Sequence, residues 1–229
     1  MLRFAGICAV TACAIAVATV LASPARAAPQ IYRYEVEHPT YGNIGTYTNI
    51  VERSGDDVEV KTKVRIAVKV LGIRLFHQDA DRTELWRNGR LVSFHSNTDD
   101  NGKKIDVNGK AQGARFVIVT PHGRIAAPAQ VHPSNPWAPQ VLHTNMMMSS
   151  KTGQVLPVVV TDKGETSVTF NGRTMRLHQY AVDSDKHQIV WVDNQGVVEA
   201  FQTVERGTRI DFVLKHPLQT AANEHTADQ

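Results

Sequence analysis

Hydrophobic and polar side chains alternate strictly between residues 58 and 70. Every second position is apolar or a threonine, and mostly charged side chains stand between them (Val58, Val60, Thr62, Val64, Ile66, Val68 and Val70 against Glu59, Lys61, Lys63, Arg65 and Lys69). A period of two places one set of side chains in a core and the other in water. This segment is therefore predicted to be a strand of an antiparallel sheet.

Turn-forming residues recur about every ten positions along the rest of the chain, as expected for a meander. They are Ser54-Gly55-Asp56, Asn88-Gly89, Asp100-Asn101-Gly102, Asn108-Gly109, His122-Gly123, Lys163-Gly164, Asn171-Gly172, Asn194-Gln195-Gly196 and Arg206-Gly207. The strands predicted between them are 30–38, 44–54, 57–71, 73–87, 90–98, 103–109, 113–120, 154–161, 165–171, 173–183, 186–193, 197–205 and 208–215. Strands as long as 57–71 and 73–87 coil strongly. We expect a mostly β fold, a curved antiparallel meander that forms a half-barrel or a barrel.

Residues 128–153 interrupt the strand pattern. Four prolines lie between positions 128 and 139, which excludes a central strand there, and Pro139 suits the first turn of a helix. A short helix over 138–149 is predicted to cap an open end of the sheet. It would contain Met146, Met147 and Met148, and three consecutive methionines cannot all face one side. These methionines and Trp137 are the candidate residues for a ligand cavity, since methionine suits adaptable apolar surfaces.

The first 27 residues are typical of a cleaved secretory signal peptide. Arg3 precedes an uncharged apolar stretch from Phe4 to Leu21, and Ala25-Arg26-Ala27 offers small residues at the cleavage site. Cleavage would leave a single β domain over 28–217 and a disordered tail over 218–229, exported to the periplasm or the extracellular space. The alternatives are an uncleaved membrane anchor, and a lipoprotein cut before Cys13.

Composition narrows the chemistry of the exported part. Both cysteines, Cys8 and Cys13, lie in the segment predicted to be removed, so the mature chain has no disulfide and no thiolate. That segment also holds two of the 25 basic residues, which leaves the mature charge near +1 against 22 acidic residues. Such a charge does not favour nucleic acid as a partner. After cleavage we expect no membrane span.

Several motifs spread over the mature chain resemble those of a bacterial family of exported β-proteins, domain of unknown function 6134 (DUF6134). They are Tyr32-Arg33-Tyr34-Glu35-Val36 with Gly45, Glu84-Leu85-Trp86-Arg87-Asn88-Gly89-Arg90-Leu91, Asp99-Asp100-Asn101-Gly102, Trp137 before the methionines, Gly153-Gln154-Val155-Leu156-Pro157-Val158, and Val190-Trp191-Val192-Asp193-Asn194-Gln195-Gly196-Val197-Val198-Glu199. The resemblance implies a curved antiparallel sheet in the cell envelope. It transfers no catalytic residue.

Two patterns could bind a metal. The ten histidines include no His-x-His or His-Glu-x-x-His pair, although His77 and His95, and likewise His178 and His187, fall on neighbouring predicted strands. Asn97, Asp99 and Asn101 before Gly102 imitate the start of a calcium loop, but position twelve is Asn108 where a glutamate is required. A hairpin turn accounts for the same residues. We therefore predict scattered surface histidines, no metal site and no cofactor.

No catalytic residues are predicted, because the chain lacks a Gly-x-Ser-x-Gly elbow and its carboxylates form no recognisable pair. The favoured function is a non-catalytic periplasmic binding or scaffolding protein whose curved sheet holds an apolar ligand, an acyl chain or another envelope component. A cell-envelope hydrolase of glycans or esters, and a purely structural interaction protein, are the alternatives. The oligomeric state stays open.

Overall fold

The computed structural model describes residues 28–170, 172–205, 207–215 and 219–220. Most of these residues lie in strands, and every strand pairing except that of β9 with β10 is antiparallel, which confirms the predicted fold class. The predicted signal peptide lies outside the described residues, and so does most of the predicted disordered tail. Within that tail Gln219–Thr220 form strand β17, which pairs with β1.

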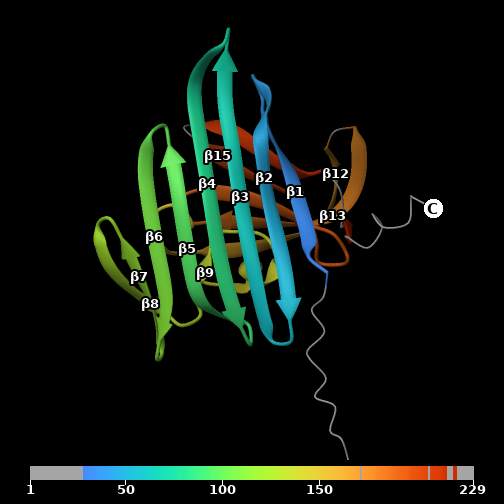
Figure 1. Ribbon diagram of the computed structural model, residues 1–229. Coiled ribbons are helices and arrows are strands. Elements are labelled where there is room, and N and C mark those ends of the chain that lie inside the picture. The colour runs from blue at the N-terminus through green and yellow to red at the C-terminus, as the bar shows by residue number, and fades with distance from the viewer. Residues whose placement is uncertain (1–27, 171, 206, 216–218, 221–229) are drawn as a thin grey trace, which may run out of the picture.

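One large sheet contains fourteen of the strands in the described chain and has two walls (Figure 1). The first wall is β1 (Gln30–His38), β2 (Gly42–Ser54), β3 (Asp57–Val70), β4 (Ile73–Arg87), β5 (Arg90–Asp100), β6 (Lys103–Gln112), β7 (Arg115–Thr120) and β8 (Gly123–Pro128). The second wall is β12 (Val159–Phe170), β13 (Arg173–Asp183), β14 (His187–Val192), β15 (Val198–Glu205) and β16 (Thr208–Leu214). The walls join where β16 pairs with β1, and no pairing between β8 and β12 is found among the described residues. The sheet is therefore curved and open.

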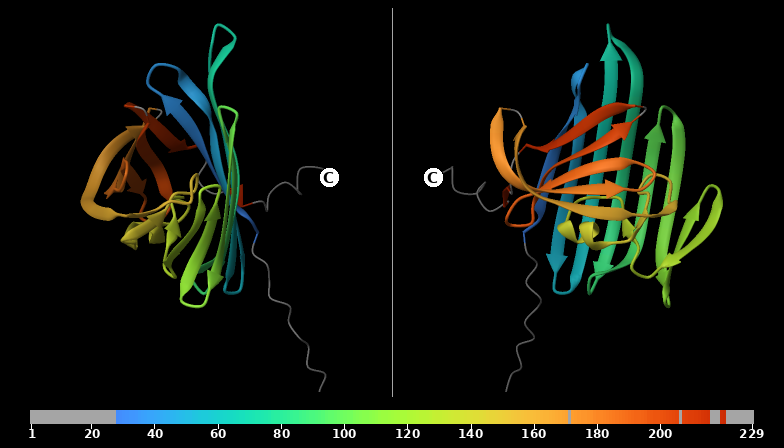
Figure 2. Two further views of the ribbon diagram at one scale, coloured as in Figure 1. Left: turned by 90° about the vertical axis from the view of Figure 1, so that its left-hand side faces the viewer. Right: turned by 180° about the vertical axis from the view of Figure 1, so that it is seen from behind.

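The two walls face each other across one hydrophobic core (Figure 2). In β3 the alternation is as predicted, with Val60 and Val64 buried and Lys63 exposed between buried neighbours. Aromatic rings from both walls meet in the middle, where Tyr47 lies 5.6 Å from Phe201 between ring centroids. These contacts set the distance between the walls, since protein cores are close-packed.

A short segment fills one end of the space between the walls, and we call residues 131–157 the cap (Figure 2). It contains β9 (His132–Pro133), the 3₁₀ helix η1 (Pro139–His143), β10 (Met146–Met148) and β11 (Val155–Pro157). The predicted helix over 138–149 is therefore correct in position but wrong in extent. It ends because Thr144 is extended and the methionines pair with β9 and β11 instead.

Two predicted turns are also wrong. Asn108-Gly109 lies inside β6, where a Cβ on residue 109 would stand 2.4 Å from the ring of Phe116, so glycine is needed for a close approach. Lys163-Gly164 is a bulge inside β12, where the Asp162 carboxylate accepts a hydrogen bond from the Gly164 amide. Glycine therefore serves a close side-chain approach at Gly109 and a β-bulge at Gly164, and neither position is a hairpin turn.

We call the end of the sheet at which the β1–β2, β3–β4 and β5–β6 hairpins turn the open end (Figure 1). The β3–β4 hairpin reaches farthest there, beyond the neighbouring hairpins (Figure 1). Among the described residues no helix has the length and apolar character needed to cross a membrane.

Candidate functional site

A groove of about 440 Å³ lies between the two walls at the open end. Its apolar surface comes from Ile66 and Val68 of β3, Phe76 of β4, and Ile210 and Phe212 of β16. Each of these positions belongs to the inward-facing set of its strand, so the alternation that builds the core also lines the groove. The volume falls within the range of roughly 300–1,000 Å³ usual for small-molecule pockets.

Charged side chains form the rim of this groove. The Lys151 ammonium lies 2.6 Å from the Asp100 carboxylate, and Lys186 forms an ion pair with Glu205. Lys151 belongs to the cap, which is therefore tied to β5 near the groove.

Two polar atoms of the groove have no hydrogen-bond partner within the described protein. They are Oδ1 of Asp100 and Oγ1 of Thr203, and both are buried. Buried polar atoms are nearly always paired, so an unpaired atom beside a cavity marks a place where a ligand or water can bind. An apolar surface with polar and charged residues at its edge suits an amphipathic molecule, whose chain lies on the apolar residues while its polar group lies near Lys151, Lys186 and Thr203.

A second polar cluster lies in the core near the cap. Its centre is Glu84 of β4, which is fully buried. Oε1 of Glu84 accepts from the Asn135 amide at 2.7 Å, and Oε2 accepts from the indole nitrogens of Trp86 at 2.9 Å and Trp137 at 3.0 Å. Asn135 and Trp137 belong to the cap, so this carboxylate holds the cap against the first wall.

The electrostatics of this cluster follow from its burial. Desolvation raises the pKa of the Glu84 carboxyl, and its three hydrogen bonds and the Arg82 charge offset this only in part. Burial likewise raises the pKa of Tyr47 far above its usual value. The Tyr47 hydroxyl donates to Asn135 Oδ1 at 2.7 Å, and Asn135 Nδ2 also donates to Thr62 at 2.9 Å. Both carboxylate oxygens of Glu84 are thus occupied by protein donors, and Glu84 is not among the residues that line the hollows we describe.

An aromatic hollow of about 170 Å³ lies outside this cluster, between the cap and the first wall. Trp86, Trp137 and His132 line it, and Arg53 lies over the Trp137 ring at 5.7 Å from the centroid. Burial lowers the pKa of His132, whose ring lies 5.0 Å from that of Trp86. The hollow has less than half the volume of the groove, and its charged side chain already covers one ring.

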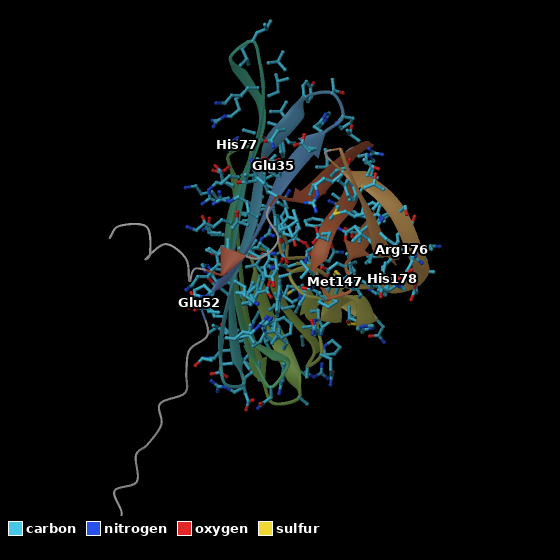
Figure 3. The ribbon with its side chains drawn as sticks, turned by 90° about the vertical axis from the view of Figure 1, so that its right-hand side faces the viewer. Glu35, Glu52, His77, Met147, Arg176 and His178 are labelled. Atoms are coloured by element: carbon cyan, nitrogen blue, oxygen red, sulfur yellow. The ribbon has the colours of Figure 1, made fainter. Side chains whose placement is uncertain are left out.

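The predicted cavity residues lie at the capped end and do not line the groove. Met148 is fully buried, Met147 borders a hollow of only about 20 Å³, and Met146 is half-buried. Figure 3 places Met147 between the walls. Trp137 lines the aromatic hollow. Trp137 and Met147 thus border small hollows at the cap, and the groove lies elsewhere between the walls, with Lys151 of the cap at its edge.

The histidines considered as metal ligands pair with aspartate side chains of the sheet instead. His77 Nε2 lies 3.2 Å from Asp99, His95 Nε2 lies 3.0 Å from Asp106, and the two histidines are not paired with each other. His77 and His178 lie on opposite sides of the molecule (Figure 3).

The calcium-like residues belong to the end of β5 and to the hairpin turn that follows it. Asp99 Oδ1 accepts from the Gly102 amide, Asn101 Oδ1 accepts from the His77 amide, and Asn97 is exposed. The described residues contain no group of three or more His, Cys, Asp or Glu side chains placed to hold a metal ion.

Comparison with known proteins agrees with this architecture. The profile of the family described as "Domain of unknown function (DUF6134)" matches residues 34–215. The chain belongs to the DUF6134 family. The sequence matches no curated protein.

The fold of this DUF6134 protein is similar to that of a β-barrel-like protein of DUF1849 from Brucella abortus, known from a crystal structure. The TM-score is 0.62 at 8% identity, and the similarity covers 85% of this chain and 99% of the other. At that identity the likeness shows a shared fold and nothing about a shared ligand.

Sequence reasoning missed the groove residues because they look like any other core position. Ile66 and Val68 were correctly assigned to the inward face, yet nothing in the pattern says that a groove separates them from Ile210 and Phe212 of the second wall. One signal was available. Five of the seven residues from Lys69 to Leu75 are apolar or glycine at a predicted hairpin tip, where polar residues are usual.

Proposed function

We propose that this DUF6134 protein is an exported, non-catalytic binding protein that holds the acyl chain of an envelope component in the groove. The observation that carries the proposal is the groove itself, whose apolar surface of about 440 Å³ borders two unpaired buried polar atoms. The signal-like N-terminus supports the assignment to the periplasm or extracellular space.

A groove between two opposed walls suits an acyl chain better than a flat apolar surface would. Ile66 and Val68 face Ile210 and Phe212 across the groove, so a chain placed there contacts protein on two sides. Each methylene removed from water contributes about 0.8 kcal/mol. The Lys151 and Lys186 ammonium groups and the Thr203 hydroxyl supply donors for a carboxylate headgroup, whereas the Asp100 carboxylate can only accept.

A hydrolase at Glu84 is not favoured. A general acid or base needs an oxygen that can reach the substrate, and both oxygens of this carboxylate are held by three protein donors. The groove carries two carboxylates, Asp100 and Glu205, and each is paired with an ammonium group, that of Lys151 and of Lys186 respectively.

The test is direct binding of a series of saturated fatty acids to residues 28–229, which include every described element. Titration calorimetry is carried out with octanoate, decanoate and dodecanoate. We expect each added pair of methylenes to tighten binding by about 15-fold until the chain outgrows the groove. Native mass spectrometry of the protein as purified from the exporting cell should show a bound amphipathic molecule. A protein that binds none of the three acids and carries no such molecule would refute the proposal.

Two matched variants locate the binding. Leu75 and Leu85 lie on the same strand and are 57% and 40% exposed, but Leu75 lines the groove and Leu85 does not. Leu75→Ser should weaken decanoate binding by about fivefold, corresponding to about 1 kcal/mol for a partly buried leucine. Leu85→Ser should leave it unchanged. Equal effects of both substitutions would place the ligand elsewhere.

A further inference from the structure

The tip of the β3–β4 hairpin is the most exposed apolar segment among the described residues. All seven residues from Lys69 to Leu75 are exposed, and the side chains of Leu71, Ile73 and Leu75 are 98%, 67% and 57% exposed. The hairpin projects beyond its neighbours at the open end (Figures 1 and 2). Scattered exposed aliphatic residues need no explanation, but several on one projecting tip indicate a surface that contacts an apolar phase.

The backbone conformation of Leu71 supports the interpretation that the tip contacts an apolar phase. Leu71 and Gly72 form a two-residue turn in which both φ angles are positive, at 49° and 80°. The equivalent first position in two other two-residue hairpins is Asn88, with φ 50°, and Asn101, with φ 53°. Asparagine adopts this conformation readily, whereas leucine adopts it rarely and at a cost. Leucine here lowers stability and is 98% exposed, so its role lies outside the fold.

The charges beside the tip point to the nature of the partner. Lys69 and Arg74 are direct neighbours across the hairpin, and the segment from Lys69 to Leu75 has no acidic residue. Apolar side chains at the end with cations just behind them match the order of a lipid leaflet, in which acyl chains lie beneath anionic headgroups. Long basic side chains can reach the headgroups while their stems stay on apolar surface.

The tip is continuous with the groove. Leu75 at its base and the adjacent Phe76 line the groove, and so does Tyr41 in the neighbouring β1–β2 turn, which is 45% exposed. Tyrosine is enriched at membrane interfaces because its ring is apolar and its hydroxyl polar. A surface that receives the tip would therefore lie at the mouth of the groove.

We propose that the tip of the β3–β4 hairpin inserts into the surface of an anionic lipid bilayer and brings the groove mouth to the lipid. The purpose of this docking, transfer of an acyl-chain ligand between bilayer and groove, rests on the function proposed above. The docking itself does not rest on that function, so the docking proposal and the binding proposal can each be refuted without the other.

The decisive variant is Leu71→Asn, tested by flotation of residues 28–229 with vesicles of phosphatidylcholine alone or mixed with phosphatidylglycerol at three to one. The bound fraction on anionic vesicles should fall by about tenfold or more, since the most exposed apolar side chain is lost. The melting temperature should rise, on the order of 3 °C, since asparagine suits the turn. Weaker membrane binding in a more stable protein cannot be attributed to unfolding. A lower melting temperature would show that Leu71 packs within the protein and would overturn the proposal.

Two further variants separate charge from apolar contact and supply a control. Lys69→Ser with Arg74→Ser should reduce binding to anionic vesicles and leave binding to neutral vesicles unchanged. Val159→Asn removes another aliphatic side chain that is 64% exposed, far along the chain in β12, and should bind vesicles like the original protein. The proposal is overturned if the original protein does not float with either vesicle, or if Val159→Asn reduces binding as much as Leu71→Asn.

Decanoate titration distinguishes this proposal from the binding function. Leu71→Asn should bind decanoate normally, because Leu71 does not line the groove. If the protein binds decanoate but not vesicles, only the docking proposal is refuted. If it binds vesicles but no fatty acid, only the groove proposal is refuted.

Discussion

Replacement of Glu84 tests how the cap is held against the first wall. Glu84→Ala removes an acceptor from two indole groups and from the Asn135 amide. Trp86 is buried and Trp137 partly buried, so at least one indole N–H would lose its partner without gaining water. Each unpaired buried donor costs about 1–3 kcal/mol, and breaking a buried charged network costs about 3–5 kcal/mol. We expect a loss of about 4 kcal/mol in the free energy of unfolding.

Glu84→Gln disturbs the hydrogen bonds of this cluster less than Glu84→Ala does. Its side-chain oxygen can still accept from both indoles, but its NH₂ would face the Asn135 NH₂ group. Asn135 cannot simply turn its amide, because its oxygen accepts from Tyr47. A single mismatched pair should cost about 2 kcal/mol. Urea unfolding followed by tryptophan fluorescence and by circular dichroism measures both losses. If Glu84→Ala costs less than Glu84→Gln, or if neither loss exceeds about 1 kcal/mol, the cluster does not hold the cap as described.

The pH dependence of the same pair follows from the raised pKa of Glu84. An acid whose pKa is higher in the folded than in the unfolded state binds more protons when folded, so its contribution to stability is complete below the unfolded pKa of about 4.3 and declines as pH rises through the folded pKa. The stability gap between the original protein and Glu84→Gln should be widest at acid pH and narrow as pH rises. A gap that widens with pH would mean that the three donors outweigh desolvation.

Three further predictions address other parts of the fold, each measured by urea unfolding. Gly109→Ala should cost about 1–3 kcal/mol because the new Cβ would overlap the Phe116 ring, and a neutral result would mean that the ring can move. Thr203→Val should raise stability by about 1 kcal/mol because it removes an unpaired buried hydroxyl, while weakening any ligand bonded there; a loss of stability would show that the hydroxyl has a partner. Burial lowers the pKa of His132, so stability should be lost as pH falls below about 6.5, and His132→Gln should remove that slope.

Strand positions and faces could be predicted from the sequence because they follow from local chemistry. The alternation in β3 identified Val60 and Val64 as inward, and Asn88-Gly89 and Asn101-Gly102 marked real hairpins. The errors came where glycine had a tertiary role. Gly109 looks like the second residue of an Asn-Gly turn, and only the position of Phe116 explains why it is inside a strand.

The site could not be predicted because it depends on how far the two walls overlap. The methionines gave a local signal of adaptable apolar surface, but β9 and β11 pair with them on both sides and leave Met148 fully buried. The groove depends instead on β3 and β4 extending past the second wall. That extension follows from strand lengths and from the register between β16 and β1, which no local pattern encodes.

The contrast between the two ends of the sheet is the strongest physical argument for where function lies. In the core near the cap, Glu84, Asn135 and Tyr47 pair with one another, and the unpaired buried nitrogens Asn49 Nδ2 and Arg82 Nε border none of the hollows described above. At the open end Asp100 and Thr203 each leave a buried oxygen without a partner beside a groove with an apolar surface. Desolvating a polar atom without pairing it is costly, and stability alone would favour an apolar residue at such a site. Unpaired atoms next to a cavity large enough for a ligand are therefore better explained by binding than by folding.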